Sequence, residues 1–180
     1  MSGNTPQQAV APLGSRLPLP LVAGALAVLV GVPGSGKSHL AARYPASWRV
    51  CLDVYRELAT DDMTDQSATP VAAQIQDLLL DARLARGLTT LVDATNIYLH
   101  VRTKLLARAR YWQRPIVAVL FDVPLSVAHA RNAGRERVVA PQVLDDLNAQ
   151  MPTADQLLAE GFTAVYLASD IARGAGRSTT

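Results

Sequence analysis

A glycine-rich loop directly after an apolar run constrains this chain more than any other feature. The loop fits the pattern G-x-x-x-x-G-K-S/T at every fixed position, and it consists of Gly31, Val32, Pro33, Gly34, Ser35, Gly36, Lys37 and Ser38. Glycines at these places let successive backbone N–H groups turn inward toward phosphate oxygens. The pattern requires a buried strand before the loop, here expected at about 25–30, and a helix after it. The loop therefore predicts a site for a nucleoside triphosphate.

Two side chains of the loop have predicted chemical roles. Lys37 is expected to reach the β- and γ-phosphates, and the Ser38 hydroxyl is expected to be a ligand of Mg²⁺. A helix that begins near Lys37 adds its positive end to the same place, and His39 of that helix is included in the predicted nucleotide site. We therefore expect ATP or GTP as the phosphate donor, bound with Mg²⁺.

The apolar stretch 17–32 raises the question of a membrane segment or a secretory signal. Pro18 and Pro20 interrupt it and leave fewer apolar residues than the ~20 that a membrane span needs, so we expect no membrane contact. The net charge of +2 is too small for a strong electrostatic attraction to nucleic acid, although a local basic patch is compatible with it. Cys51 is the single cysteine. It is expected to be a small buried thiol in a cytoplasmic protein.

Strand-like and helix-like segments alternate along the chain. Strands are expected at 25–30, 48–53, 88–93, 115–122 and 162–167, and helices at 70–86, 98–113, 124 to about 132, and 141–151. This alternation predicts an α/β fold in which helices cover both faces of a parallel sheet. In such a sheet, ligands bind at the carboxyl ends of the strands.

Composition changes near both ends of the chain. Residues 1–20 are rich in Pro, Gln, Ser and Gly, which predicts a flexible arm, and residues 171–180 are expected to be a frayed tail. One domain is therefore expected over 21–170. Within its helix 70–86, the apolar face is expected to consist of Val71, Ile75, Leu78, Leu79 and Ala82.

A carboxylate and a guanidinium follow the second predicted strand. Asp53 ends this strand, and Arg56 comes three residues later, so a helix that starts at Asp53 would place both side chains on one face. Asp53 is then a candidate general base for an acceptor hydroxyl, and Arg56 could hold an anion on the acceptor. The residues alone leave open the alternative that Asp53 caps the helix and pairs with Arg56.

The third predicted strand leads into the sequence VDATN at residues 92–96. Asp93 is a candidate to hold a water molecule bound to Mg²⁺, and the alternative is that it caps the strand end. Asn96 and, six residues later, Arg102 are candidate contacts for the acceptor.

Three arginines lie close together between the fourth predicted strand and the helix that Pro141 opens. They are Arg131, Arg135 and Arg137, and Gly134 lies among them. This composition suits a mobile lid over about 131–151 that closes over the nucleotide, brings guanidinium groups to the phosphates and excludes water. Surface salt bridges would explain one of these arginines more readily than three.

Taken in order, these motifs resemble the kinase module of the polynucleotide 5′-hydroxyl kinase family over about 26–151. The resemblance rests on GVPGSGKS, Asp53-x-x-Arg56, VDATN and R-N-x-x-R-x-R before Pro141. It implies a P-loop kinase-type three-layer fold with a five-stranded parallel sheet and a helical lid. It also implies that Lys37, Asp53 and Arg135 are catalytic, Arg131 lies against the nucleobase or phosphates, and Arg56 contacts the acceptor's phosphate.

The reaction implied by the resemblance is transfer of the γ-phosphate of ATP or GTP to the 5′-hydroxyl of a polynucleotide. The same module occurs in kinases for small metabolites, antibiotics and sugar nucleotides, including zeta-toxin-like kinases, so a small hydroxyl acceptor is the main alternative. An ATPase switch without an acceptor is a third hypothesis. The guanine-reading motif N-K-x-D does not occur in the sequence, which disfavours a GTPase switch. A homodimer is compatible with the sequence.

Overall fold

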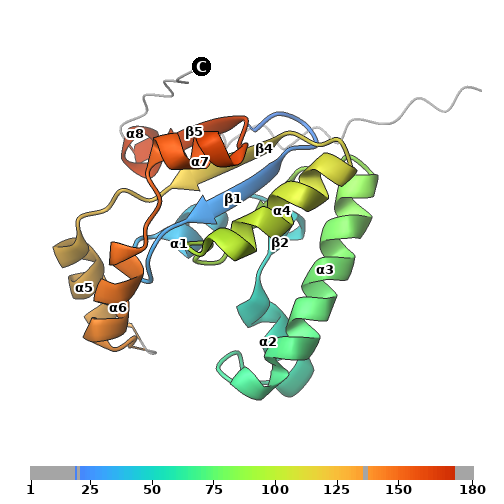
Figure 1. The fold of residues 1–180 in the computed structure, drawn as a ribbon. Helices are drawn as coiled ribbons and strands as arrows, with labels where there is room; N and C mark the ends of the chain where they lie inside the picture. The colour runs from blue at the N-terminus through green and yellow to red at the C-terminus, as the bar shows by residue number, and fades with distance from the viewer. Residues whose placement is uncertain (1–18, 20, 136–137, 173–180) are drawn as a thin grey trace, which may run out of the picture.

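The chain builds a parallel sheet whose strands come from distant parts of the sequence (Figure 1). The computed structural model describes Leu19, residues 21–135 and residues 138–172. Within this part the sheet has five strands in the order β2-β3-β1-β4-β5. They are β1 (Leu26–Val30), β2 (Arg49–Val50), β3 (Thr90–Val92), β4 (Ile116–Leu120) and β5 (Ala164–Leu167). The predicted five-stranded parallel sheet is confirmed.

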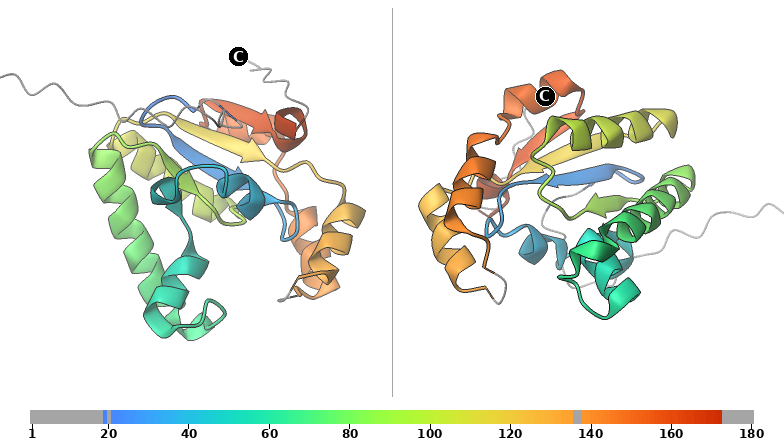
Figure 2. Two further views of the ribbon diagram at one scale, coloured as in Figure 1. Left: turned by 180° about the vertical axis from the view of Figure 1, so that it is seen from behind. Right: turned by 60° about the horizontal axis from the view of Figure 1, so that its bottom comes forward.

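Helices cover both faces of this sheet and so form the two outer layers (Figures 1 and 2). One face packs against α3 (Thr69–Ala85), α4 (Leu99–Tyr111) and α7 (Ala154–Glu160). The other face packs against α1 (Lys37–Ala41) and α8 (Ala168–Ala172). Two short 3-10 helices, Ala46–Trp48 and Gln66–Ala68, lie in the connections. The predicted three-layer α/β fold is therefore confirmed.

The central strand β1 explains why its sequence is apolar without interruption. Leu26, Val28 and Val30 contact the layer of α3 and α4, whereas Ala27 and Leu29 contact the layer of α1. All five are completely buried, as expected for a parallel strand covered on both faces. The strand therefore holds the glycine-rich loop at a fixed place at the carboxyl edge of the sheet.

Two helices stand at that edge, beyond the end of β1 (Figure 2). They are α5 (Leu125–Ala133) and α6 (Pro141–Ala149). Ala128 of α5 and Leu144 of α6 are fully buried against Val32 of the glycine-rich loop and against Ile97. Burial of this small apolar cluster anchors the predicted lid region to the loop itself.

The second predicted strand is wrong in extent. Strand β2 contains only Arg49 and Val50, and helix α2 (Leu52–Thr60) follows almost at once. Helical spacing from Leu52 brings Tyr55 into the core under α3, where it is 5% exposed. This burial favours a helix over a longer strand. Asp53 consequently lies in the first turn of α2 and not at a strand end.

The predicted helix 70–86 is present as α3, but of its predicted apolar face only Ile75 packs against the core. Val71, Leu78 and Leu79 are exposed, whereas Ala72, Leu80 and Leu84 are fully buried. Because leucines occupy positions 78, 79 and 80, apolar residues at helical spacing form two possible faces that are shifted by one residue. The spacing alone did not determine which of these faces packs on the sheet.

The predicted end segments differ from the structure where they can be compared. Leu19, predicted to belong to a flexible arm, is buried, and its carbonyl accepts a hydrogen bond of 3.3 Å from the Tyr44 hydroxyl. Helix α8 continues to Ala172, inside the predicted tail. The remaining positions of these segments, 1–18, 20 and 173–180, lie outside the described residues. Among the described residues, no helix combines the length and the apolar composition needed to cross a membrane.

Candidate active site

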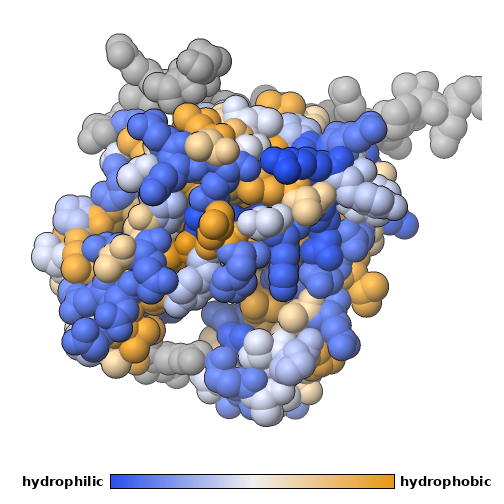
Figure 3. Space-filling model, in the orientation of Figure 1, coloured by the Kyte–Doolittle hydropathy of each residue, from blue (hydrophilic) through white to orange (hydrophobic). Residues whose placement is uncertain are grey.

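A cleft of about 530 Å³ opens where β1, β2 and β3 end. On the molecular surface, a hollow separates the part formed by α5 and α6 from the part formed by α2 (Figure 3). The lining brings together side chains that are far apart in the sequence: Pro33, Gly34, Gly36, Lys37, Ser38, His39, Cys51, Leu52, Asp53, Arg56, Met63, Asp93, Ala94, Thr95, Arg131, Arg135 and Val139. Most of the predicted site residues therefore share one cleft.

The shape of the glycine-rich loop depends on backbone contacts at Gly34. This residue has a φ of +79°, and a Cβ placed on it would lie 2.6 Å from the Ala128 carbonyl oxygen of α5. A side chain is therefore excluded by both conformation and space. The other end of the loop is tied down as well, since the Gly31 N–H donates to the Thr95 carbonyl over 3.0 Å. Gly31, Val32 and Ser35 lie behind the lining of the cleft.

Lys37 is buried within the loop and already bonded there. Its Nζ donates to the carbonyl oxygens of Gly31 and Val32, each over 2.8 Å. Burial lowers the pKa of Lys37 to about 8; Asp93 opposes this shift, and Arg135 adds to it. A phosphate group placed in the loop would supply the negative charge that favours the protonated ammonium.

Asp93 meets Ser38 at the end of β3, as the predicted metal site requires. The Ser38 hydroxyl donates to Asp93 Oδ1 over 3.4 Å. A hydroxyl and a carboxylate are hard oxygen ligands of the kind that Mg²⁺ prefers, and this ion usually takes its other ligands from substrate phosphates and water. Within the described ranges, no group of three or more His, Cys, Asp or Glu side chains gathers to hold a metal. These two residues therefore fit a Mg²⁺ ion that arrives with the nucleotide.

A residue that the sequence did not reveal completes this corner of the site. Arg49 of β2 donates from Nε to Asp93 Oδ2 over 2.8 Å, and its terminal nitrogen lies 2.6 Å from the same oxygen. The two side chains share a face of the sheet because Arg49 is in register with Leu91, two residues before Asp93. Only this register, which no local pattern in the sequence specifies, could have identified Arg49.

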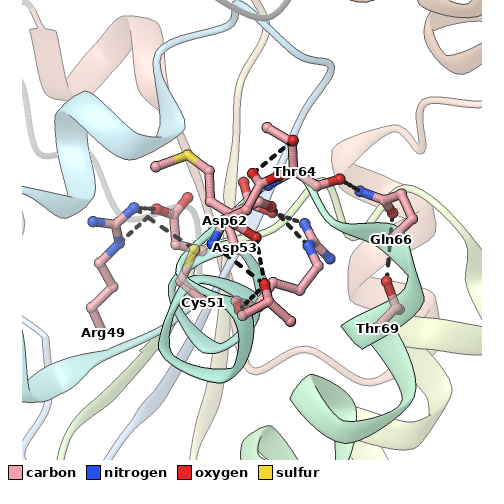
Figure 4. A network of polar contacts seen from close by, with 11 residues as sticks. Arg49, Cys51, Asp53, Asp62, Thr64, Gln66 and Thr69 are labelled. Carbon is pink, nitrogen blue, oxygen red and sulfur yellow. Dashed lines mark hydrogen bonds and ion pairs between the residues drawn. The ribbon is translucent and has the colours of Figure 1, made fainter.

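Another part of the cleft lining comes from α2 and the residues after it, and Figure 4 shows polar contacts of this region. Arg56 is 6% exposed; its Nε donates to the Met63 carbonyl over 3.0 Å, and its terminal nitrogen pairs with the Asp53 carboxylate. The shared helix face of Asp53 and Arg56 is confirmed. Asp53 is not the cap of α2, because Cys51 holds that position. Since a guanidinium has five N–H donors, Arg56 has donors left for a ligand.

The predicted lid arginines lie on the α5 side of the cleft. Arg131 occupies the last turn of α5, and Arg135 follows the end of this helix. Both are exposed, and both line the cleft. The third arginine of this group, Arg137, lies outside the described residues. The structure thus brings two of the three guanidinium groups to the phosphate side of the cleft.

The structure does not bring Asn96 and Arg102 into the cleft, so their predicted acceptor role is not supported. The Asn96 amide is buried and donates to the Leu29 carbonyl over 2.7 Å, which ties the β3–α4 loop to β1. Arg102 lines a separate hollow of about 600 Å³. Its guanidinium pairs with Glu160 of α7 over 2.6 Å and donates to the Asn96 and Ile97 carbonyls. Both side chains are used in packing the fold.

We expect Arg102→Ala to destabilise the protein and to leave the cleft at the glycine-rich loop unchanged. The guanidinium is 4% exposed, and its removal leaves the Glu160 carboxylate and two carbonyl oxygens without their donor. Breaking a buried ion pair by removing one partner should lower the free energy of unfolding by about 3 kcal/mol. Urea unfolding measures this change. Arg108→Ala is the matched control, because Arg108 pairs with the exposed Asp77 and Asp81 and should contribute at most about 1 kcal/mol.

Comparison with known proteins places this fold and cleft among relatives. A family model described as AAA_33, AAA domain, matches residues 26–157, which is more than half of the chain. A chain of the Pnkp1/Rnl/Hen1 RNA repair complex has a TM-score of 0.61 at 23% identity, over 71% of this chain and 43% of that chain. The present chain therefore spans less than half the length of that protein. No curated protein matches the sequence.

Two further solved structures match over most of their own length. Kti12 from Chaetomium thermophilum, in complex with ADP-AlF₃, has a TM-score of 0.54 at 13% identity, over 82% of this chain and 94% of that chain. A gluconokinase from Sinorhizobium meliloti 1021 has a TM-score of 0.52 at 20% identity, over 85% of this chain and 88% of that chain. At these identities, the likenesses show the shared fold. The family match establishes that the chain belongs to the AAA_33 family of AAA domains, and its fold is of the P-loop kinase type.

Proposed function

We propose that this P-loop kinase domain transfers the γ-phosphate of ATP or GTP to the 5′-hydroxyl of a polynucleotide, with Mg²⁺. One observation carries the proposal: the Asp53–Arg56 pair shares a single cleft with Lys37 and Ser38. A nucleotide-hydrolysing switch needs the phosphate loop and its metal. A kinase needs, in addition, a group that receives the acceptor's proton and a group that holds the acceptor.

The donor half of the proposed reaction uses residues of the loop and β3. Lys37 would place its charge on the β- and γ-phosphates, and backbone N–H groups of 33–38 would bind their oxygens. Ser38 and Asp93 would hold Mg²⁺, which lessens the charge repulsion that the attacking oxygen meets. His39 lies in the cleft beside Ser38 and belongs to the same half.

The acceptor half uses the pair on α2. The Asp53 side chain is 57% exposed, while Arg56, its ion-pair partner, is almost entirely buried. Arg56 thus fixes one carboxylate oxygen and leaves the other accessible from the cleft. As the acceptor oxygen bonds to the γ-phosphorus and the bond to the leaving ADP or GDP breaks, Asp53 would take the hydroxyl proton. The remaining Arg56 donors suit a phosphate on the acceptor.

The arginines beside α5 complete the proposed site. Arg135 would contact the transferring phosphate, where a guanidinium stabilises charge in the transition state. Arg131 would lie against the nucleobase or the phosphates of the donor. Both arginines carry the same positive charge as Lys37, so the three groups repel one another. The negative charge of a bound triphosphate would offset this repulsion.

The likeness to a chain of an RNA repair complex supports a polynucleotide as the acceptor. The gluconokinase likeness, which covers more of its own chain, makes a small hydroxyl compound the alternative. The test is a panel of acceptors incubated with labelled ATP or GTP and Mg²⁺. It contains a 5′-OH oligonucleotide, a nucleoside 3′-monophosphate, the matching nucleoside and gluconate. Label on the oligonucleotide supports the proposal, and label on gluconate alone overturns it.

We expect the enzyme to prefer a 5′-OH nucleoside that carries a 3′-phosphate over the same nucleoside without it. Arg56→Ala should remove most of this preference. Loss of a charge-assisted hydrogen bond costs about 1.5–3 kcal/mol, which corresponds to roughly 10- to 150-fold in specificity. The measurement is the ratio of kcat/KM for a nucleoside 3′-monophosphate to that for the nucleoside, in wild type and variant. Because Arg56 also holds Asp53, absolute rates will fall for both acceptors, and only the ratio isolates phosphate recognition.

Arg86→Ala is the matched control for this comparison. Arg86 is exposed and donates to the Ala82 carbonyl at the end of α3, outside the cleft. It should retain the wild-type ratio. An equal ratio in wild type and Arg56→Ala would remove Arg56 from the acceptor site.

A further inference from the structure

The side-chain amide of Asn132, in the last turn of α5, bonds to the backbone of Val139, which lies just before α6. Its Nδ2 donates to the Val139 carbonyl over 2.7 Å, and the Val139 N–H donates back to Asn132 Oδ1 over 3.1 Å. The amide therefore bonds both polar groups of one backbone residue, as a neighbouring strand would. Asn132 is 2% exposed, so water competes little for these two bonds.

Arg135 lies within the segment that this amide fastens. The Arg135 N–H donates to the Asn132 carbonyl over 3.1 Å, and Val139, at the other end of the segment, lines the cleft together with Arg135. The Arg135 side chain itself is exposed, and an arginine side chain has many accessible rotamers. The position of its backbone therefore determines how readily the guanidinium reaches the phosphates.

The backbone of Asn132 also lies directly against the phosphate loop. A Cβ placed on Gly34 would lie 3.3 Å from the Asn132 backbone nitrogen and 2.6 Å from the Ala128 carbonyl oxygen. The last turns of α5 thus rest on the loop without an intervening side chain. Asn132 consequently has the loop on its backbone side and the Arg135 segment on its side-chain side.

We propose that Asn132 is a positioning residue, which sets the Arg135 guanidinium over the phosphate loop and contributes to phosphoryl transfer only through Arg135. This inference rests on the proposed function, in which Arg135 contacts the transferring phosphate. It assigns a chemical consequence to a buried amide that is not part of the cleft lining.

The test is a double-mutant cycle of Asn132→Ala and Arg135→Ala, measured as kcat with saturating nucleotide and acceptor. Asn132→Ala should lower kcat by ~10- to 100-fold, because a displacement of about 1 Å can cost 10²-fold, and should change the KM for nucleotide little. The double variant should turn over at about the rate of Arg135→Ala alone, since a residue that acts only through Arg135 has no effect once Arg135 is gone. Multiplication of the two single effects, or wild-type kcat in Asn132→Ala, would overturn the proposal.

His129→Ala is the matched control on the same two helices. His129 Nε2 lies 2.7 Å from Asp145 Oδ1, so this variant removes a polar contact between α5 and α6 without affecting Val139. It should retain wild-type kcat. Thermal unfolding of each variant shows whether it is folded. If Asn132→Ala does not fold, Asn132→Ser, which keeps a hydroxyl at this place, enters the same cycle with the same expectations.

A second measurement does not depend on activity. Exchange of the Val139 amide hydrogen should be faster in Asn132→Ala than in wild type and unchanged in His129→Ala. Unchanged exchange in Asn132→Ala would show that the amide does not hold the segment and would overturn the proposal. If no acceptor is phosphorylated at all, the proposed function of the site fails. If Arg135→Ala turns over normally while the 5′-OH oligonucleotide is still phosphorylated, the function stands and the positioning proposal is overturned. Faster Val139 exchange would then still assign the holding of the segment to Asn132.

Discussion

Lys37→Ala should lower kcat by roughly 10³- to 10⁵-fold, the scale on which a positive group at the transferring phosphate acts in phosphotransferases. The Lys37 ammonium sits inside the loop, bonded to two of its carbonyl oxygens, and Asp93 and Arg135 act on its charge. No other side chain of the loop can replace it, because an alanine at this position leaves the loop without a cationic group between the β- and γ-phosphates. The variant is measured by single-turnover transfer from labelled ATP.

Lys104→Ala is the matched control for this prediction. Lys104 is the only other lysine, and it is exposed on α4, outside the cleft. It should retain wild-type turnover, and thermal unfolding should show that both variants are folded. Normal transfer by a folded Lys37→Ala protein would remove this loop from the reaction.

Asp53→Asn should lower kcat by ~10²–10⁴-fold, the usual contribution of a general base, with little change in nucleotide affinity. The amide keeps the size of the side chain and can still accept a hydrogen bond from Arg56, but it does not take up a proton. The side chain is more than half exposed beside the cleft, so the substitution has no core to disturb. Pre-steady-state transfer to the 5′-OH oligonucleotide, with nucleotide binding measured separately, distinguishes chemistry from affinity.

Glu57→Gln provides the comparison for Asp53→Asn. It makes the same chemical change on the same helix, at an exposed position that does not line the cleft. If Asp53→Asn and Glu57→Gln both turn over normally, Asp53 is a surface partner of Arg56 and not a base.

Local patterns in the sequence were sufficient to predict the centre of the fold. A completely apolar strand, a glycine-rich loop and a helix come one after another in the chain, so each supports the others. Gly34 is in a left-handed conformation against α5, which only glycine tolerates at such a contact. The parallel sheet and the phosphate-loop side of the cleft were therefore predictable.

Long-range contacts limited the rest of the prediction. Strand β2 ends early because a helix from Leu52 onward packs Tyr55 into the core, and part of that core comes from α3. The pairing of Arg49 with Asp93 depends on the register of β2 against β3. Arg102 resembles a ligand-binding residue in the sequence, but its partner Glu160 is 58 residues away. In each case, the deciding contact lies in another part of the chain.

The placement of α2 has a consequence for how kinases of this kind diversify. Among the described residues, strand β2 lies at the edge of the sheet and pairs only with β3, so α2 extends from a border and not from the centre. Donor chemistry depends on the central strand, whereas Asp53 and Arg56 depend on this border. If Asp53 and Arg56 hold the acceptor as proposed, substitutions in 52–65 would alter which hydroxyl compound enters without changing how the triphosphate is held. The proposed assignment therefore makes this segment the place to engineer a change of acceptor while the nucleotide site is kept intact.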